Sequence, residues 1–177
     1  MIIEYGCIKG LEGLVFVVKE GKKVKAVHPF LCDKMDVDFC LDYVVTKWEK
    51  PESIKRSDLS YLKKIDFKDL DLSFLTPFSK KVYHKLYLTK AGELLSYGEL
   101  AAKAGKPSAA RVVGTLMRKN CFPIIVPCHR VYAKSGEESF TINCFHKRPS
   151  ACANKKEASL RECAKRIKMS LRKSEIE

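Results

Sequence analysis

The sequence lacks any apolar run near the length that a membrane-spanning helix requires. About 20 consecutive apolar residues are needed to cross a bilayer, and every apolar stretch in the 177 residues is far shorter. The segment from Met1 to Gly6 has no basic region and no cleavage-site pattern, which argues against a secretory signal peptide. We therefore expect a cytoplasmic protein with no membrane partner.

The spacings typical of metal and redox sites are also missing. None of the eight cysteines forms a Cys-x-x-Cys pair, and the four histidines show no ligand spacing with one another. A chain of this length can build its own core, so free thiols are expected rather than disulfides. We expect no metal and no cofactor. A zinc site made from Cys7, Cys32 and His28 is the alternative that the sequence leaves open.

Acidic residues are scarce in the second half of the chain. Residues 1–75 contain 13 basic and 13 acidic side chains, whereas residues 76–177 contain 21 basic and only 8 acidic ones. The formal net charge of +13 therefore lies entirely in the second half. Such concentrated positive charge favours a phosphate-bearing partner, either nucleic acid or an anionic membrane.

The first 75 residues are typical of a small α/β scaffold domain. Alternating and β-branched residues predict strands, and a hairpin turn is expected at 19–22. Helical spacing of apolar residues continues until Pro51, which ends it. No structure is assigned to residues 52–71, and no chemical motif is found in this half. The expected strands cover 2–7, 14–19 and 23–28, and the expected helix covers 36–50.

Three predicted helices begin the second half. Thr76 followed by Pro77 is typical of a helix start. Ser96 and Glu99 fit a capping box, and Gly105 is a natural stop for the helix that this box begins. Two short helices joined by a tight glycine-containing turn are typical of a helix-turn-helix unit. The three helices are expected over 77–87, 96–104 and 109–119.

The third predicted helix combines small residues with basic ones. Small residues let a backbone approach another surface closely, and Arg111 is the long side chain among them. Small residues alone would fit a tightly packed core helix, but the basic residues beside them favour DNA. Residues 96–135 hold seven basic side chains and one acidic one. The small residues are Ser108, Ala109, Ala110 and Gly114, and the other basic ones are Arg118 and Lys119.

The run at 124–131 carries a candidate nucleophile. Three apolar residues precede Pro127, which fixes φ and has no N–H, so a buried strand is expected to stop there and deliver Cys128 into a pocket. The pKa of a free cysteine is about 8.5, and neighbouring positive charge lowers it. His129 and Arg130 therefore favour a thiolate. The alternative is a core cysteine followed by two surface bases.

Four sequence blocks together resemble the O6-alkylguanine-DNA alkyltransferase family. They occur in that family's order and spacing and cover roughly residues 76–136. The resemblance implies an α/β, ribonuclease H-like N-terminal domain (1–75). A mostly helical, winged-helix-like catalytic domain with a DNA-binding helix-turn-helix (76–177) would follow. The blocks are Ser96–Ala101 (SYGELA), Ala110–Gly114 (ARVVG), Met117–Asn120 (MRKN) and Pro127–Val131 (PCHRV).

The resemblance implies a DNA repair protein that acts as a methylated-DNA–protein-cysteine S-methyltransferase. Its partner would be double-stranded DNA containing O6-alkylguanine, and the protein would act as a monomer. The damaged base must be rotated out of the stack before its alkyl group can be reached. Transfer to Cys128 would be irreversible, because the thioether product is not hydrolysed, so each molecule would act once.

The resemblance also assigns roles to single residues. Cys128 would accept the alkyl group and His129 would activate it, in the family through a water molecule. Asn120 would bridge the helix-turn-helix and the active-site turn. Tyr97 would donate to the guanine, and Arg111 would enter the duplex where the base has left.

Further residues complete the implied site. The sequence departs from the family pattern after residue 136, so the C-terminal assignments rest on fewer matching positions. Glu162 is taken as the glutamate that orients His129, with Glu157 as its rival. The basic tail from residue 146 is expected to hold a helix over 158–169, and the last residues of the chain are expected to fray. The guanine pocket would include Pro123, Val131, Phe140 and Thr141, and DNA contacts would include Ser108, Ala109, Gly114, Arg118 and Arg130.

Two other functions compete with alkyl transfer. A module that recognises alkylated guanine without transferring the group would not need an acceptor thiol, so Cys128 argues against it. A cysteine hydrolase would use Cys128 and His129, but such enzymes usually take the two groups from distant parts of the sequence.

Overall fold

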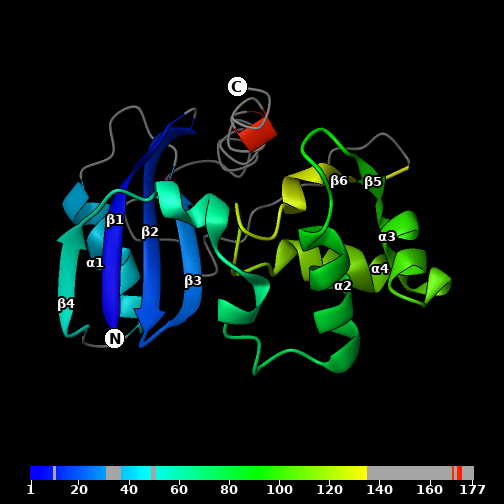
Figure 1. The fold of residues 1–177 in the computed structure, drawn as a ribbon, viewed down its shortest axis with the longest axis horizontal. Helices are drawn as coiled ribbons and strands as arrows, with labels where there is room; N and C mark the ends of the chain where they lie inside the picture. Colours follow the sequence, from blue (N-terminus) through cyan, green and yellow to red (C-terminus); the bar gives the residue numbers. More distant parts are fainter. Residues whose placement is uncertain (10, 31–36, 49–50, 135–168, 170, 173–177) are drawn as a thin grey trace, which may run out of the picture.

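A four-stranded sheet and a mostly helical half lie side by side in the computed structural model of the chain (Figure 1). The structure describes residues 1–9, 11–30, 37–48, 51–134, 169 and 171–172. The described C-terminal residues lie where the two halves meet (Figure 1). Within the described part of the chain, no helix is both long and apolar enough to cross a membrane.

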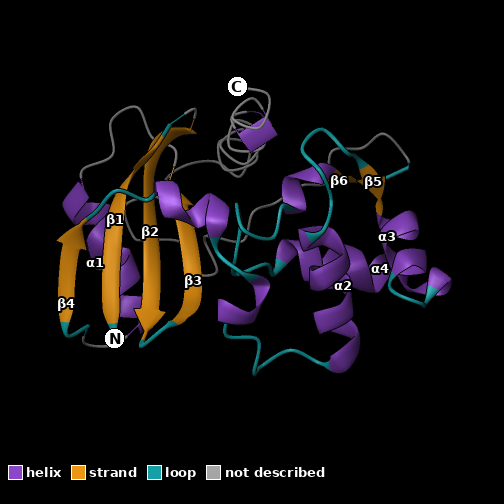
Figure 2. Ribbon diagram, in the orientation of Figure 1, coloured by secondary structure: helices purple, strands orange, loops and turns teal. Residues whose placement is uncertain are grey.

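The sheet has the strand order β3-β2-β1-β4 (Figure 2). The first three strands pair antiparallel, and β4 joins the other side of β1 in parallel. All four residues of β4 are exposed, which explains why no apolar alternation marks it in the sequence. The elements of this half are β1 (Ile2–Ile8), β2 (Leu11–Glu20), β3 (Lys23–Phe30), α1 (Val37–Trp48) and β4 (Ser53–Arg56).

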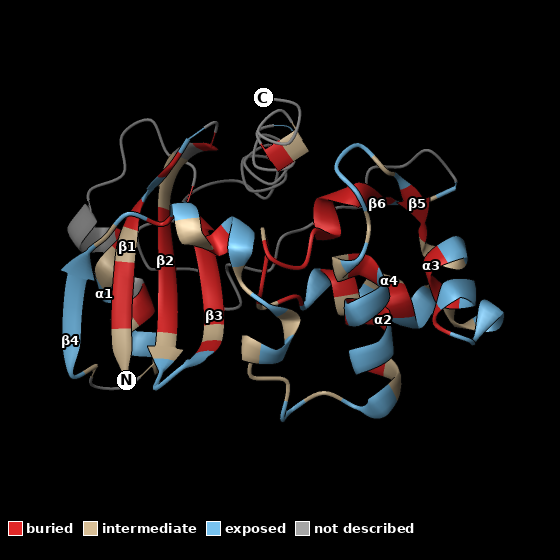
Figure 3. Cartoon of the chain, in the orientation of Figure 1, coloured by how far each residue is buried: buried red, intermediate tan, exposed pale blue. Residues whose placement is uncertain are grey.

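Alternation along β2 divides the core between two faces of the sheet. Phe16 and Val18 pack on one face with Cys40 and Val44 of α1. Val15 and its neighbours on the opposite face belong to the larger cluster, which continues into the helical half. Because successive residues of a strand point to opposite faces, a strand with both alternate sets buried must be covered on both sides. The red colouring of β2 in Figure 3 shows this burial.

The helical half begins as the sequence predicts. Thr76 caps α2 by accepting a hydrogen bond from the backbone of Ser79, and Ser96 with Glu99 forms the expected capping box of α3. A turn separates α3 from α4, and a two-residue parallel pair links β5 with β6. The elements are α2 (Pro77–Tyr87), β5 (Leu95–Ser96), α3 (Tyr97–Lys103), α4 (Ala110–Arg118) and β6 (Val131–Tyr132).

The two halves are joined by a backbone hydrogen bond, by a ring contact and by one shared core. The Val27 amide donates to the Cys121 carbonyl at 2.8 Å. The Phe74 and Phe122 rings stack with their centroids 6.3 Å apart. Because the larger cluster takes residues from both halves, the division into domains at residue 75 stays a prediction.

Candidate active site

The segment before the candidate nucleophile is a loop closed by side-chain hydrogen bonds, so the prediction that the apolar run at 124–126 is a buried strand was wrong. Asn120 Nδ2 donates to the Val126 carbonyl at 2.9 Å, and Asn120 Oδ1 accepts from the Phe122 amide at 2.9 Å. Ile124 has a φ of 80°, which is an outlier for a β-branched residue. The loop closes because the buried Asn120 amide satisfies backbone groups that a strand would have paired with a neighbour.

Cys128 lies on a single 3-10 turn that runs from Cys128 to Arg130. The Arg130 amide donates to the Pro127 carbonyl at 3.0 Å, and the Val131 amide donates to the Cys128 carbonyl. We call this segment, residues 127–131, the nucleophile turn. Pro127 suits the position before it, because its missing N–H is not needed there.

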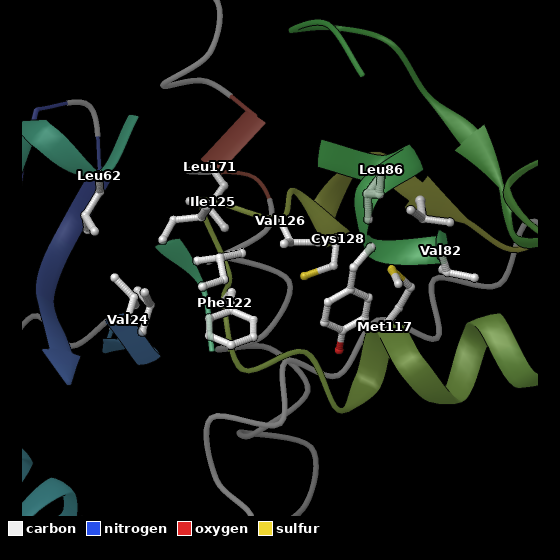
Figure 4. Close-up of a cluster of buried hydrophobic side chains, with 14 of the residues drawn as sticks. Val24, Leu62, Val82, Leu86, Met117, Phe122, Ile125, Val126, Cys128 and Leu171 are labelled. Carbon is white, nitrogen blue, oxygen red and sulfur yellow. The ribbon is translucent and has the colours of Figure 1, made fainter. Parts of the chain in front are cut away.

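The thiol of Cys128 is enclosed by other side chains. The residue is only 1% exposed and belongs to the larger core cluster. Figure 4 shows Cys128 between Val126 and Met117. Burial raises the pKa of Tyr83, with smaller contributions from the nearby Cys121 and Cys128, and its hydroxyl donates to the Leu116 carbonyl at 3.2 Å. Tyr83 was not predicted to be a site residue, because its spacing in the sequence is that of an ordinary core position of α2.

Arg130 is placed differently from the DNA contact that the sequence suggested. It is 9% exposed, and its Nη1 donates to the Thr89 carbonyl and, at 2.9 Å, to the Thr89 hydroxyl. Thr89 follows the end of α2, where a cation is favoured by the helix dipole. The guanidinium thus ties the nucleophile turn to α2, and a contact with DNA stays a prediction that this burial does not favour.

The other core positions of the expected site are buried together. His129 is 2% exposed, and Pro123 and Val131 are also buried. Val131 begins β6, which pairs with β5 directly before α3: Leu95 lies opposite Val131, and Ser96 lies opposite Tyr132. This short strand pair brings the start of α3 beside the end of the nucleophile turn, although more than 30 residues separate them in the sequence.

Apart from Arg130, the residues expected to touch DNA lie on α3, on α4 and on the short 3-10 turn between them. Arg111, Arg118 and Ser108 are exposed, and Ala109 is half-buried. Gly114 of α4 faces Tyr97 of α3, since a Cβ on this glycine would lie 3.9 Å from the Tyr97 ring. That distance is ordinary van der Waals contact. The packing of the two helices therefore does not require glycine at position 114.

Four expected site residues lie outside the described residues. They are Glu162, its rival Glu157, Phe140 and Thr141. Cys32 of the alternative zinc site also lies outside them, and the described residues contain no group of three His, Cys, Asp or Glu side chains that could hold a metal. His28 is buried and accepts a hydrogen bond from Trp48 Nε1 at 3.0 Å. Burial, followed by the charge of Lys47, lowers the pKa of His28 to about 3.

Most of the second half of the chain matches a known protein family. Residues 77–162 match the family described as "6-O-methylguanine DNA methyltransferase, DNA binding domain". The match begins at the first residue of α2 and includes α3, α4 and the nucleophile turn.

Relatives extend the similarity into the first half. The chain is 34% identical over 130 residues to a methylated-DNA–protein-cysteine methyltransferase of Thermococcus kodakarensis, covering 71% of this chain and 72% of that protein. It is 34% identical over 137 residues to the human protein of the same name, covering 74% of this chain but 63% of that protein. The chain thus spans roughly two thirds of the length of these relatives.

A solved structure shares the fold. The O6-methylguanine-DNA methyltransferase of Pyrococcus kodakaraensis strain KOD1 superposes with a TM-score of 0.55 at 26% identity. The superposition covers 76% of this chain and 88% of that protein. The similarity includes both the mixed sheet and the helices beside it.

Proposed function

Since the chain belongs to the methylated-DNA–protein-cysteine methyltransferase family, we propose that it repairs DNA by moving the alkyl group of O6-alkylguanine onto its own Cys128. The family's activity is alkyl transfer to a cysteine, and Cys128 is the cysteine at the position of the family's Pro-Cys-His-Arg block. The substrate is double-stranded DNA containing O6-alkylguanine. Each molecule acts once, because the thioether that forms is stable in water.

The observation that carries the proposal is the pairing of β5 with β6. It brings the thiol-bearing turn beside Tyr97 at the start of α3. DNA can therefore bind to the surface formed by α3 and α4, with Cys128 directly behind that surface.

Transfer requires the damaged nucleotide to leave the helix stack. Extrusion costs a few kcal/mol, and less for a pair already weakened by damage. Arg111 is exposed on α4, and we propose that its side chain fills the gap left by the base. Side chains inserted into the minor groove compensate unstacking in this way in other proteins. The small residues around Arg111 allow the α4 backbone to approach the DNA closely.

The chemical step is a single displacement. The Cys128 sulfur forms a bond to the alkyl carbon while the bond from that carbon to guanine O6 breaks. His129 takes the thiol proton, and Tyr97 supplies a proton to the departing guanine, which makes it a better leaving group. The loop closed by Asn120 holds the turn so that the sulfur keeps its direction of attack.

Entry of the base must part some of the side chains that enclose Cys128. The residue is 1% exposed, so an everted base can reach the sulfur only if the turn or its neighbours move. We propose that binding of DNA to α3 and α4 drives this movement through the adjoining β5–β6 pair.

The finer description of the fold belongs to the same proposal. Three antiparallel strands followed by a helix and a parallel fourth strand beside the first, in the order β3-β2-β1-β4, support a ribonuclease H-like N-terminal domain. The α3–α4 pair with the small β5–β6 sheet supports a winged-helix-like domain with a helix-turn-helix. We expect a cytoplasmic monomer.

Mass spectrometry tests the proposal directly. Incubation with an O6-methylguanine duplex should add one methyl mass to the peptide that contains Cys128, with a yield of one methyl per protein. A matched duplex with unmodified guanine is the control, and Cys128→Ala should bind the damaged duplex without accepting the group. A methyl on another cysteine, or repair by Cys128→Ala, would refute the assignment.

A further inference from the structure

Two residues beyond the family match lie against the nucleophile turn. The match ends at residue 162, yet Arg172 Nε donates a hydrogen bond to the His129 carbonyl at 3.1 Å. Its neighbour Leu171 is 3% exposed and belongs to the same core cluster as Cys128. Both residues lie beyond the helix expected over 158–169, and the last residues, which are expected to fray, lie outside the described ones.

The hydrogen bond from Arg172 reaches a third carbonyl of the nucleophile turn. Within the nucleophile turn, the Pro127 carbonyl accepts from the Arg130 amide and the Cys128 carbonyl accepts from the Val131 amide. The His129 carbonyl accepts from the Arg172 side chain. By donating to this carbonyl, Arg172 helps to hold the peptide bond between His129 and Arg130.

Leu171 supports the same contact from the core. Figure 4 shows its side chain beside Ile125 and Val126, the two residues that precede Pro127. Packing of Leu171 there lowers the entropy cost of holding the next side chain, Arg172, at the turn. The two residues together contact both sides of the nucleophile, the loop before it and the carbonyl after it.

We propose that Arg172 is a positioning residue for alkyl transfer, which the C-terminal segment adds to the family's site. It fixes the His129 peptide, and through it the imidazole and the neighbouring sulfur, in the orientation that the displacement needs. Hydrogen bonds from charged donors are stronger than neutral ones, so this single contact can set the position of a short turn. The inference rests on the proposed function for its catalytic part, while the contact itself can be tested without DNA.

Two measurements on one set of variants test the proposal. The first is the single-turnover rate of methyl transfer at saturating damaged duplex. The second is the rate at which a small haloacetamide labels Cys128, followed by peptide mass. Arg172→Ala should lower the first rate about tenfold and raise the second, since a released turn attacks the base poorly but exposes its sulfur more often. Arg172→Lys keeps a charged donor and should recover part of both rates.

Controls separate positioning from other effects. Arg56→Ala removes the same charge from an exposed residue of β4 and should change neither rate. Unchanged transfer and unchanged labelling in Arg172→Ala would overturn the proposal. A loss of DNA affinity with an unchanged saturated rate would also overturn it, by making Arg172 a DNA contact. If the native protein transfers no methyl group, the proposed function fails, and the labelling rates alone then decide whether Arg172 holds the turn.

Discussion

Replacing Gly114 by alanine separates two explanations for the small residues of α4. In the first, the small residues permit tight packing inside the protein; in the second, they permit close approach of DNA. A Cβ at position 114 would lie 3.9 Å from the Tyr97 ring, which is ordinary contact. The protein interior therefore accepts the added methyl group without displacement.

The expected effects on folding and on binding have opposite signs. Alanine in a helix interior is more stable than glycine by about 1 kcal/mol, so Gly114→Ala should raise the free energy of unfolding by up to that amount. Tyr97 is itself an expected DNA contact, so a methyl group beside its ring would lie where α4 meets the duplex. An added methyl group in a well-packed contact costs roughly 1–3 kcal/mol. Affinity for duplex DNA should therefore fall at least about fivefold, because about 1.4 kcal/mol corresponds to a tenfold change.

Three measurements on the purified variant test this reasoning. Thermal unfolding reports the stability, fluorescence anisotropy with a labelled duplex reports the affinity, and methyl transfer from free O6-methylguanine base reports the chemistry without DNA. Transfer from the free base should stay unchanged. If Gly114→Ala binds duplex DNA as tightly as the native protein, α4 does not approach the DNA backbone closely, and its small residues need another explanation.

Other positions give predictions of a different kind. Arg111→Ala should lower transfer from duplex DNA about tenfold, from the loss of roughly 1–2 kcal/mol of compensation for unstacking, while transfer from the free base stays unchanged; equal losses on both substrates would contradict the role. Asn120→Ala should lower the free energy of unfolding by about 3 kcal/mol, because it leaves two buried backbone groups unpaired, and denaturant unfolding should place Asn120→Asp between it and the native protein. Hydrogen bonding to Lys25, at 2.8 Å, lowers the pKa of Asp71 to about 2. Its stabilising contribution is therefore complete above pH about 4 and lost as the pH falls toward 2, and Asp71→Asn should flatten the stability profile in this window.

Much of the fold can be read from local chemistry in the sequence. The capping box at Ser96 and Glu99 and the Thr76 cap depend on neighbouring residues, so the sequence predicts them directly. Alternation predicts β1 to β3 for the same reason. The strand β4 is different: its four exposed residues take their conformation from pairing with β1, a contact between distant segments that no local pattern encodes.

The candidate site is harder to predict from local sequence patterns. The apolar run before Pro127 fits a buried strand equally well by composition, but the amide of Asn120 folds it into a loop. The sequence gives no sign that Arg130 reaches Thr89, because a basic residue after a strand is normally read as a surface group. The contact between Arg130 and Thr89, 41 residues apart, depends on the tertiary fold. Such contacts decide which basic side chains of the motif remain exposed for DNA.

Burial of Cys128 suggests that selectivity for damaged DNA depends on access to the sulfur. Side chains hold the nucleophile turn, with Asn120 before it and Arg130 within it, and the turn joins a sheet only at its last residue, Val131. Residues 127–130 can therefore open locally. A sulfur that is 1% exposed meets a small electrophile in solution only during such openings. Haloacetamide should therefore label Cys128 much more slowly than Cys7, which is exposed, and denaturation should remove the difference. Equal labelling rates in the folded protein would show that the sulfur is open to solution, and selectivity would then have to come from recognition of the base itself.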